Sequence, residues 1–163
     1  MAGLIFWGCV CLTRCRDMRT RRCVGRRRDL GGLGARALSN SPDGRWQAVG
    51  DKSGVVNVYA LGGESPESPE APEAPEKSVG NLVTACSLLR WSADSQLLAA
   101  GSSSAPGALR LVHAPSFRVF ANWPAQLPAL VSALDFSPNS GFLALGTRGG
   151  DALLFRLLSY PNY

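Results

Sequence analysis

Short apolar runs alternate with polar turns along most of this chain. Near its C-terminal end the runs cover Val131 to Phe136, Phe142 to Leu145 and Ala152 to Leu157. The first connection is Ser-Pro-Asn-Ser, in which Pro presets φ and Asn bonds its own backbone. The second connection, Gly146 to Gly150, is rich in glycine, which adopts positive φ without steric cost. Runs of this length, bounded by turn signals and rich in β-branched and aromatic residues, predict an antiparallel meander.

The same pattern occurs three times. The decapeptides SPDGRWQAVG, SADSQLLAAG and SPNSGFLALG begin at residues 41, 92 and 137. Self-similarity at a period of about 50 residues is typical of repeat proteins, in which each unit buries its apolar face against the next. Three strands per repeat, with a fourth from the following connection, predict four-stranded propeller blades. The segments expected to supply the fourth strand are FRVFANW (117–123) and MRTRRCV (18–24).

The repeat resembles the WD-repeat family, whose members form β-propellers. The resemblance lies in the Ser-Pro-Asp-Gly turn and in the strand Gly-Val-Val-Asn-Val-Tyr that follows it. The Trp-Asp dipeptide that defines the family is replaced by Tyr59-Ala60, Val112-His113 and Phe155-Arg156, so the copies are degenerate. We therefore predict an all-β fold, a partial β-propeller of about three four-stranded blades.

A narrower resemblance rests on LRLVHAPSFRVFANWP (109–124) and on the segments 17–24, 41–61 and 132–163. These resemble the C-terminal end of the propeller in the WD-repeat proteins associated with U3 small nucleolar RNA. The resemblance implies a non-enzymatic scaffold of the small-subunit processome in the nucleus and nucleolus, acting in pre-18S ribosomal RNA processing and small ribosomal subunit biogenesis. Implied partners are other processome proteins and, indirectly, U3 RNA and pre-ribosomal RNA, with no membrane, cofactor or small-molecule substrate. The alternatives are a generic WD-repeat adaptor outside the nucleolus and a non-functional truncated product.

Composition divides the chain into four segments. We expect an unassigned N-terminal segment (1–16), one or more blades with a basic segment (17–61), a disordered Pro/Glu-rich linker loop (62–78) and two C-terminal blades (79–163). In the linker, Pro and Glu recur every third residue, which favours polyproline II with its glutamates along one edge. It is either an acidic tether for a basic partner or a solvated insertion. Since family members carry a complete propeller, we expect a fragment, a shortened isoform or an incomplete gene model.

The net charge of +5 is concentrated in one stretch. Eight arginines fall within residues 14–28, and the rest of the chain is net acidic. Such a cluster is either a nucleolar address or phosphate-binding patch, or a solvated outer strand and loop. The candidate contacts for RNA or a partner are Arg19, Arg21, Arg22, Arg26, Arg27 and Arg28. Because no aromatic residue is interleaved with them, a base-stacking surface is not predicted.

Other chemistry finds little support in the sequence. The spacing of Cys9, Cys11, Cys15 and Cys23 lacks the paired C-x2-C knuckles of structural zinc, so we predict reduced thiols and no metal. The single histidine, His113, lies at a strand end, and no nucleophile or phosphate-loop motif occurs, so an enzyme is not expected. The apolar run from Ala2 to Leu12 is too short to span a bilayer, although a signal-anchored or organellar protein remains a third class. Partner contacts are expected on the glycine-bearing loops Gly50–Gly54, Gly101–Gly107 and Gly146–Gly150.

Overall fold

A computed structural model describes residues 3–4, 12–29, 32–61, 74–121, 123–124 and 127–158. Every regular element among them is a β-strand, and the strands form four antiparallel sheets. The all-β prediction is therefore confirmed. Within the described part of the chain, no helix is long and apolar enough to cross a membrane.

Three of the sheets carry one decapeptide repeat each. The first-repeat sheet contains β4 (Ala35–Asn40), β5 (Trp46–Asp51), β6 (Val56–Ala60) and β7 (Lys77–Val79) in that order. The second-repeat sheet contains β8 (Leu88–Trp91), β9 (Leu97–Gly101), β10 (Leu109–His113) and β11 (Arg118–Val119). The third-repeat sheet contains β12 (Val131–Phe136), β13 (Phe142–Thr147) and β14 (Ala152–Arg156).

A fourth sheet precedes the repeats, and the sequence did not predict it as a unit. This leading sheet contains β1 (Gly3–Leu4), β2 (Leu12–Arg16) and β3 (Cys23–Arg28). The repeat pattern predicts about three blades, because the leading sheet lacks the turn that opens each decapeptide repeat and is therefore not recognised as another copy.

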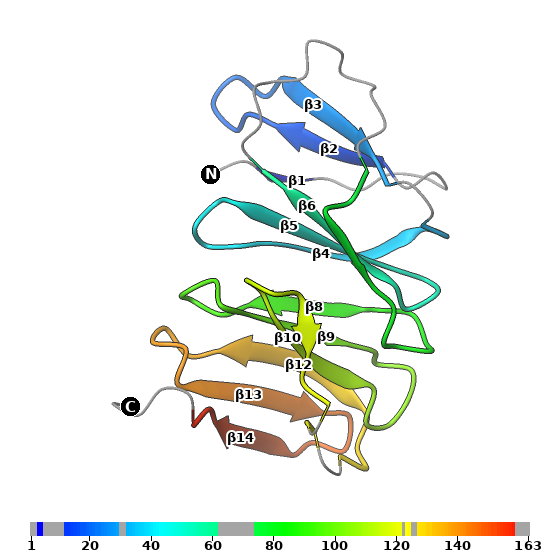
Figure 1. Ribbon diagram of the computed structural model, residues 1–163, viewed down its shortest axis with the longest axis vertical. Helices are drawn as coiled ribbons and strands as arrows, with labels where there is room; N and C mark the ends of the chain where they lie inside the picture. Colours follow the sequence, from blue (N-terminus) through cyan, green and yellow to red (C-terminus); the bar gives the residue numbers. More distant parts are fainter. Residues whose placement is uncertain are drawn as a thin grey trace.

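The four sheets stack one on another, as Figure 1 shows from the leading sheet to the third-repeat sheet. The first strand of each repeat sheet contacts the first strand of the next, β4 against β8 and β8 against β12. One apolar core lies between the first- and second-repeat sheets, and a second core lies between the second- and third-repeat sheets. The repeats therefore stabilise one another through their faces, as repeat proteins do.

The position of each sheet in the stack explains why the strands differ in their pattern of buried and exposed residues. All five residues of β9 are buried, because the second-repeat sheet has neighbours on both faces. In β14 exposed and half-buried residues alternate, since the third-repeat sheet packs on only one face within the described chain. A strand covered on both faces is continuously apolar, whereas a strand covered on one face alternates.

The two segments predicted to supply a fourth strand, 117–123 and 18–24, differ in whether they do so. Arg118 and Val119, inside the segment 117–123, form β11 and pair with β10. The neighbouring Phe117 packs edge-on against Trp46 of the preceding sheet, with ring centroids 5.2 Å apart. The expectation for 18–24 is wrong in its bounds, because most of that segment forms a turn and β3 begins only at Cys23. Residues 62–73 of the predicted Pro/Glu linker loop (62–78) lie outside the described residues. The last two residues of that range, Lys77 and Ser78, are not in a loop, because they belong to β7 and pair with β6.

Candidate interaction surfaces

The turn that opens each repeat has one geometry in all three copies. In the first copy, the Ser41 hydroxyl donates to the Asp43 carboxylate and accepts from the Trp46 amide at 2.8 Å. The Ser92 and Ser137 hydroxyls accept in the same way from the Leu97 and Phe142 amides. The serine at the first turn position therefore positions the following strand, which explains its recurrence in the decapeptides.

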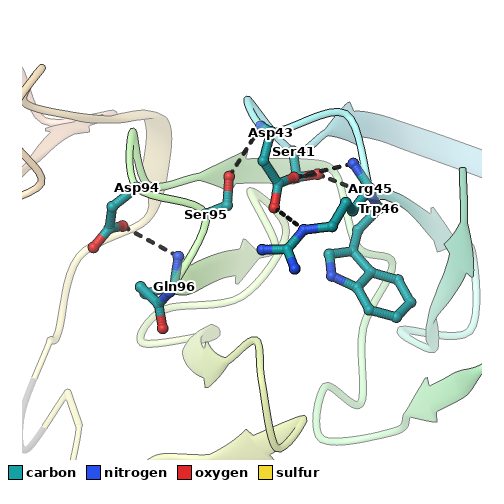
Figure 2. A network of polar contacts seen from close by, with 7 residues as sticks. All are labelled: Ser41, Asp43, Arg45, Trp46, Asp94, Ser95 and Gln96. Carbon is teal, nitrogen blue, oxygen red and sulfur yellow. Dashed lines mark hydrogen bonds and ion pairs between the residues drawn. The ribbon is translucent and has the colours of Figure 1, made fainter.

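The turns are also joined to one another across the sheets. Figure 2 shows the Asp43 amide donating to the Ser95 hydroxyl of the next sheet, at 3.2 Å. The Asp94 amide donates in the same way to the Ser140 hydroxyl, at 3.1 Å. We call these two hydrogen bonds the inter-sheet latches. Nothing in the sequence pattern identified them, because they depend on how the sheets stack.

The Asp43 carboxylate is paired within its own turn. The Arg45 guanidinium lies 2.6 Å from the Asp43 carboxylate, and the Arg45 amide donates to the same carboxylate. Desolvation raises the pKa of Asp43, but the hydrogen bonds from Ser41 and Arg45 outweigh it and lower that pKa from 3.8 to about 2. The Asp43 carboxylate therefore stabilises its own turn.

At the other end of its strands, the first-repeat sheet has a turn with different contacts. The turn between β5 and β6 is held by Asp51, whose carboxylate accepts from the Val55 amide at 2.9 Å and from the Leu33 amide at 3.2 Å. The Lys52 amide donates to the Gly34 carbonyl at 3.1 Å, which ties the same turn to the preceding loop.

The loop after β7 also packs against this turn. A Cβ on Gly54 would lie 2.4 Å from the Leu82 carbonyl oxygen, so the two backbones touch. Each of the two loops that contact the turn carries an exposed aliphatic side chain: Val83 is 97% exposed and Leu33 is 71% exposed. We call Leu33, Lys52 and Val83 the Lys52 surface. Because these side chains are exposed on ordered loops, the Lys52 surface is a candidate contact for another protein.

The six arginines predicted as contacts divide into two groups. Arg19, Arg21 and Arg22 lie in the turn between β2 and β3, and their side chains are exposed. Arg26, Arg27 and Arg28 lie in strand β3, which pairs with β2.

A buried carboxylate joins the end of the arginine-bearing strand to the first-repeat sheet. Asp29 accepts hydrogen bonds from the Asn57 amide nitrogen, at 2.7 Å, and from the Tyr59 hydroxyl. Tyr59 occupies the position of the family's Trp, so this replacement supplies a hydroxyl that binds the leading segment.

The other residues singled out in the sequence are His113 and the cysteines. His113 contacts the Ser116 hydroxyl at 2.8 Å and the Phe120 ring. Cys86 is buried, whereas Cys23 is exposed. Cys9 and Cys11 lie outside the described residues. Among the residues that are described, no three His, Cys, Asp or Glu side chains are grouped to hold a metal ion.

The chain was compared with protein-family models and with known proteins. No family model matches the chain. The chain is 36% identical to the U3 small nucleolar RNA-associated protein 18 homolog of Mus musculus over 150 residues, which is 90% of this chain. It is 42% identical to the Drosophila melanogaster homolog over 137 residues, and 37% identical to the Saccharomyces cerevisiae protein over 129 residues. The chain is homologous to U3 small nucleolar RNA-associated protein 18. The resemblance inferred from the sequence motifs is thus confirmed.

The match covers only part of these U3-associated relatives. The chain spans about a quarter of their length: 27% of the mouse protein, 26% of the fly protein and 20% of the yeast protein. Among solved structures, the WD40 domain of Toxoplasma gondii coronin aligns with a TM-score of 0.76 at 12% identity. That alignment covers 97% of this chain and 40% of the coronin chain, so the four stacked sheets are the blades of a partial WD40 propeller.

Proposed function

We propose that this chain is a non-catalytic WD-repeat scaffold of the small-subunit processome, acting in nucleolar pre-18S ribosomal RNA processing and small ribosomal subunit biogenesis. The observation that carries the proposal is its homology, over most of its length, to proteins named for their association with U3 small nucleolar RNA. The WD40 fold supports it, because rigid blades with exposed connecting loops present binding surfaces.

The scaffold acts through surfaces on its loops. The Lys52 surface is the proposed contact for a neighbouring processome protein, because Leu33 and Val83 expose apolar area on a turn fixed by Asp51. Binding there buries both aliphatic side chains at a small entropic cost, since the loops are already ordered by backbone hydrogen bonds. Association with U3 RNA and pre-ribosomal RNA follows through these protein partners.

The test is a pull-down of the full chain from nuclear extract, probed for U3 RNA and for co-purifying proteins. We expect U3 RNA to be retained by the wild-type chain and reduced at least several-fold by the combined substitutions Leu33→Ser, Lys52→Glu and Val83→Ser. The matched control is Leu158→Ser, which removes an 85% exposed apolar side chain from another part of the chain.

The possible results separate the proposal from its alternatives. A soluble, folded chain that recovers protein partners but no U3 RNA is a generic adaptor. A folded chain that recovers neither contradicts any scaffold role for this product.

A further inference from the structure

The turn between β2 and β3 is organised by one residue, Asp17. Its amide donates to the Arg22 carbonyl at 3.0 Å, and its carbonyl accepts from the Arg21 amide at 2.7 Å. Its carboxylate accepts from the Arg19 amide at 2.8 Å and from the Thr20 hydroxyl at 2.9 Å. The Arg19 amide and the Thr20 hydroxyl lower the pKa of Asp17, so the carboxylate is charged at neutral pH. An exposed turn is thus fixed by four hydrogen bonds to a single residue.

This fixed turn displays three cations. The side chains of Arg19, Arg21 and Arg22 are exposed, and none has an ion-pair partner within the described part of the chain. Arg21 has φ of 57°, in the left-handed region where a residue with a Cβ costs about 1–2 kcal/mol relative to glycine. Asn or Gly would form this backbone more easily, so the backbone alone does not account for an arginine here.

Strand register adds cationic positions beside the turn. Arg14 of β2 stands directly opposite Arg26 of β3, and Leu12 stands opposite Arg28. The register therefore places further arginine positions of the two strands next to the turn.

We propose that the turn from Asp17 to Arg22 binds the phosphate backbone of RNA directly, with Arg19, Arg21 and Arg22 as contacts and Asp17 as their positioning residue. The guanidinium fork matches phosphate oxygens bidentately, and a nucleic acid strand supplies phosphates in a continuous row. Residues 12–29 contain no aromatic side chain on which bases could stack, so the contact is to the backbone and independent of sequence. The inference rests on the proposed function for the presence of RNA, and deepens it by adding a direct contact.

The first test measures the affinity of the full chain for a fluorescent single-stranded RNA oligonucleotide by anisotropy over a series of salt concentrations. Each phosphate contact to a single strand contributes about −0.7 to the slope of log K against log salt. The combined variant Arg19→Gln, Arg21→Gln and Arg22→Gln should reduce the magnitude of the slope by about 2. The control with equal charge loss is Arg36→Gln, Arg148→Gln and Arg156→Gln, three exposed arginines elsewhere, which should keep most of the wild-type slope.

The second test separates positioning from charge. Asp17→Ala removes a negative charge, so simple electrostatics predicts tighter RNA binding, whereas loss of the turn geometry predicts weaker binding. We expect Asp17→Ala to weaken binding several-fold, and Asp17→Asn, which keeps an acceptor oxygen for the Arg19 amide, to restore it. Circular dichroism of each variant checks that the sheets remain folded.

Three results would overturn the inference. The first is a wild-type salt slope in the triple arginine variant. The second is tighter binding by Asp17→Ala, and the third is equal affinity for polyglutamate of the same charge, which would identify an acidic protein as the partner. A chain that recovers U3 RNA from extract while the triple variant keeps its slope retains the proposed function and loses only this contact.

Discussion

The Asp43 amide and the Ser95 hydroxyl, which are 3.2 Å apart, join the opening turns of two successive blades. Ser95 has φ of 61°, and its counterpart Ser140 in the next blade has φ of 59°. Gly44 occupies the same turn position in the first repeat, with φ of 74° and no hydroxyl. A serine therefore accepts left-handed backbone strain where its hydroxyl binds the preceding blade.

Substitution of Ser95 tests the balance between strain and hydrogen bond. Ser95→Ala keeps the strain and leaves the partly buried Asp43 amide without its acceptor, so we expect a loss of about 1–3 kcal/mol of unfolding free energy. Ser95→Gly loses the same acceptor but relieves about 1 kcal/mol of strain, so it should be less destabilising. Urea unfolding midpoints measure both. Equal midpoints for wild type and Ser95→Ala would show that the latch does not contribute.

The low pKa of Asp43 predicts a particular acid sensitivity. A carboxylate whose pKa falls from 3.8 to about 2 on folding stabilises the native state above pH 4, and this contribution is lost as pH falls towards 2. Asp43→Asn should therefore destabilise the chain at neutral pH and reduce the decline in stability between these pH values. Unfolding free energies of both proteins across that range measure the difference, and parallel curves would contradict the assignment.

Close approach of the first two repeat blades makes Gly50 sensitive to any side chain. A Cβ at this position would lie 2.6 Å from the Cys86 sulfur, whereas a Cβ on Gly80 would meet nothing within 4 Å. Gly50→Ala should therefore cost about 1–3 kcal/mol through overpacking, whereas Gly80→Ala should be close to neutral. The measurement is the urea midpoint of each variant. Adding Cys86→Ala to Gly50→Ala should recover part of the loss, and no recovery would place the strain elsewhere.

Thiol reactivity should distinguish the buried Cys86 from the exposed Cys23. Burial raises the pKa of the Cys86 thiol to about 12, so it stays neutral and inaccessible at neutral pH. Cys23 is exposed and should react. We expect iodoacetamide labelling, quantified for each cysteine by peptide mass spectrometry, to modify Cys23 in the native chain and Cys86 only in denaturant. Rapid native labelling of Cys86 would show that the first two repeat blades separate readily.

The strands of the repeats could be predicted because local rules and tertiary structure agree there. Strand β13 occupies Phe142 to Thr147, close to the predicted run, since apolar residues and the Ser-Pro-Asn-Ser turn mark its start. The bounds of β3 could not be predicted, because a strand made largely of arginine has no apolar alternation to reveal it.

The candidate surfaces were predictable only in part. The sequence identified the loop at Gly50–Gly54 and the arginine cluster, but it did not identify the exposed Leu33 and Val83. Their exposure depends on loops that pack against the turn through Asp51 and Gly54 from segments distant in sequence. The hydroxyl of Ser95 is similarly unremarkable in the sequence, since its partner comes from another repeat.

The scaffold role is tested by whether the full chain, tagged and expressed in cells, sediments with U3 RNA in a gradient of nuclear extract. We expect the chain and U3 RNA to sediment together in a large particle, and the variant altered at Leu33, Lys52 and Val83 to shift towards lighter fractions. If a soluble, folded wild-type chain is found only in light fractions while U3 RNA remains in the particle, this partial propeller is not a processome scaffold.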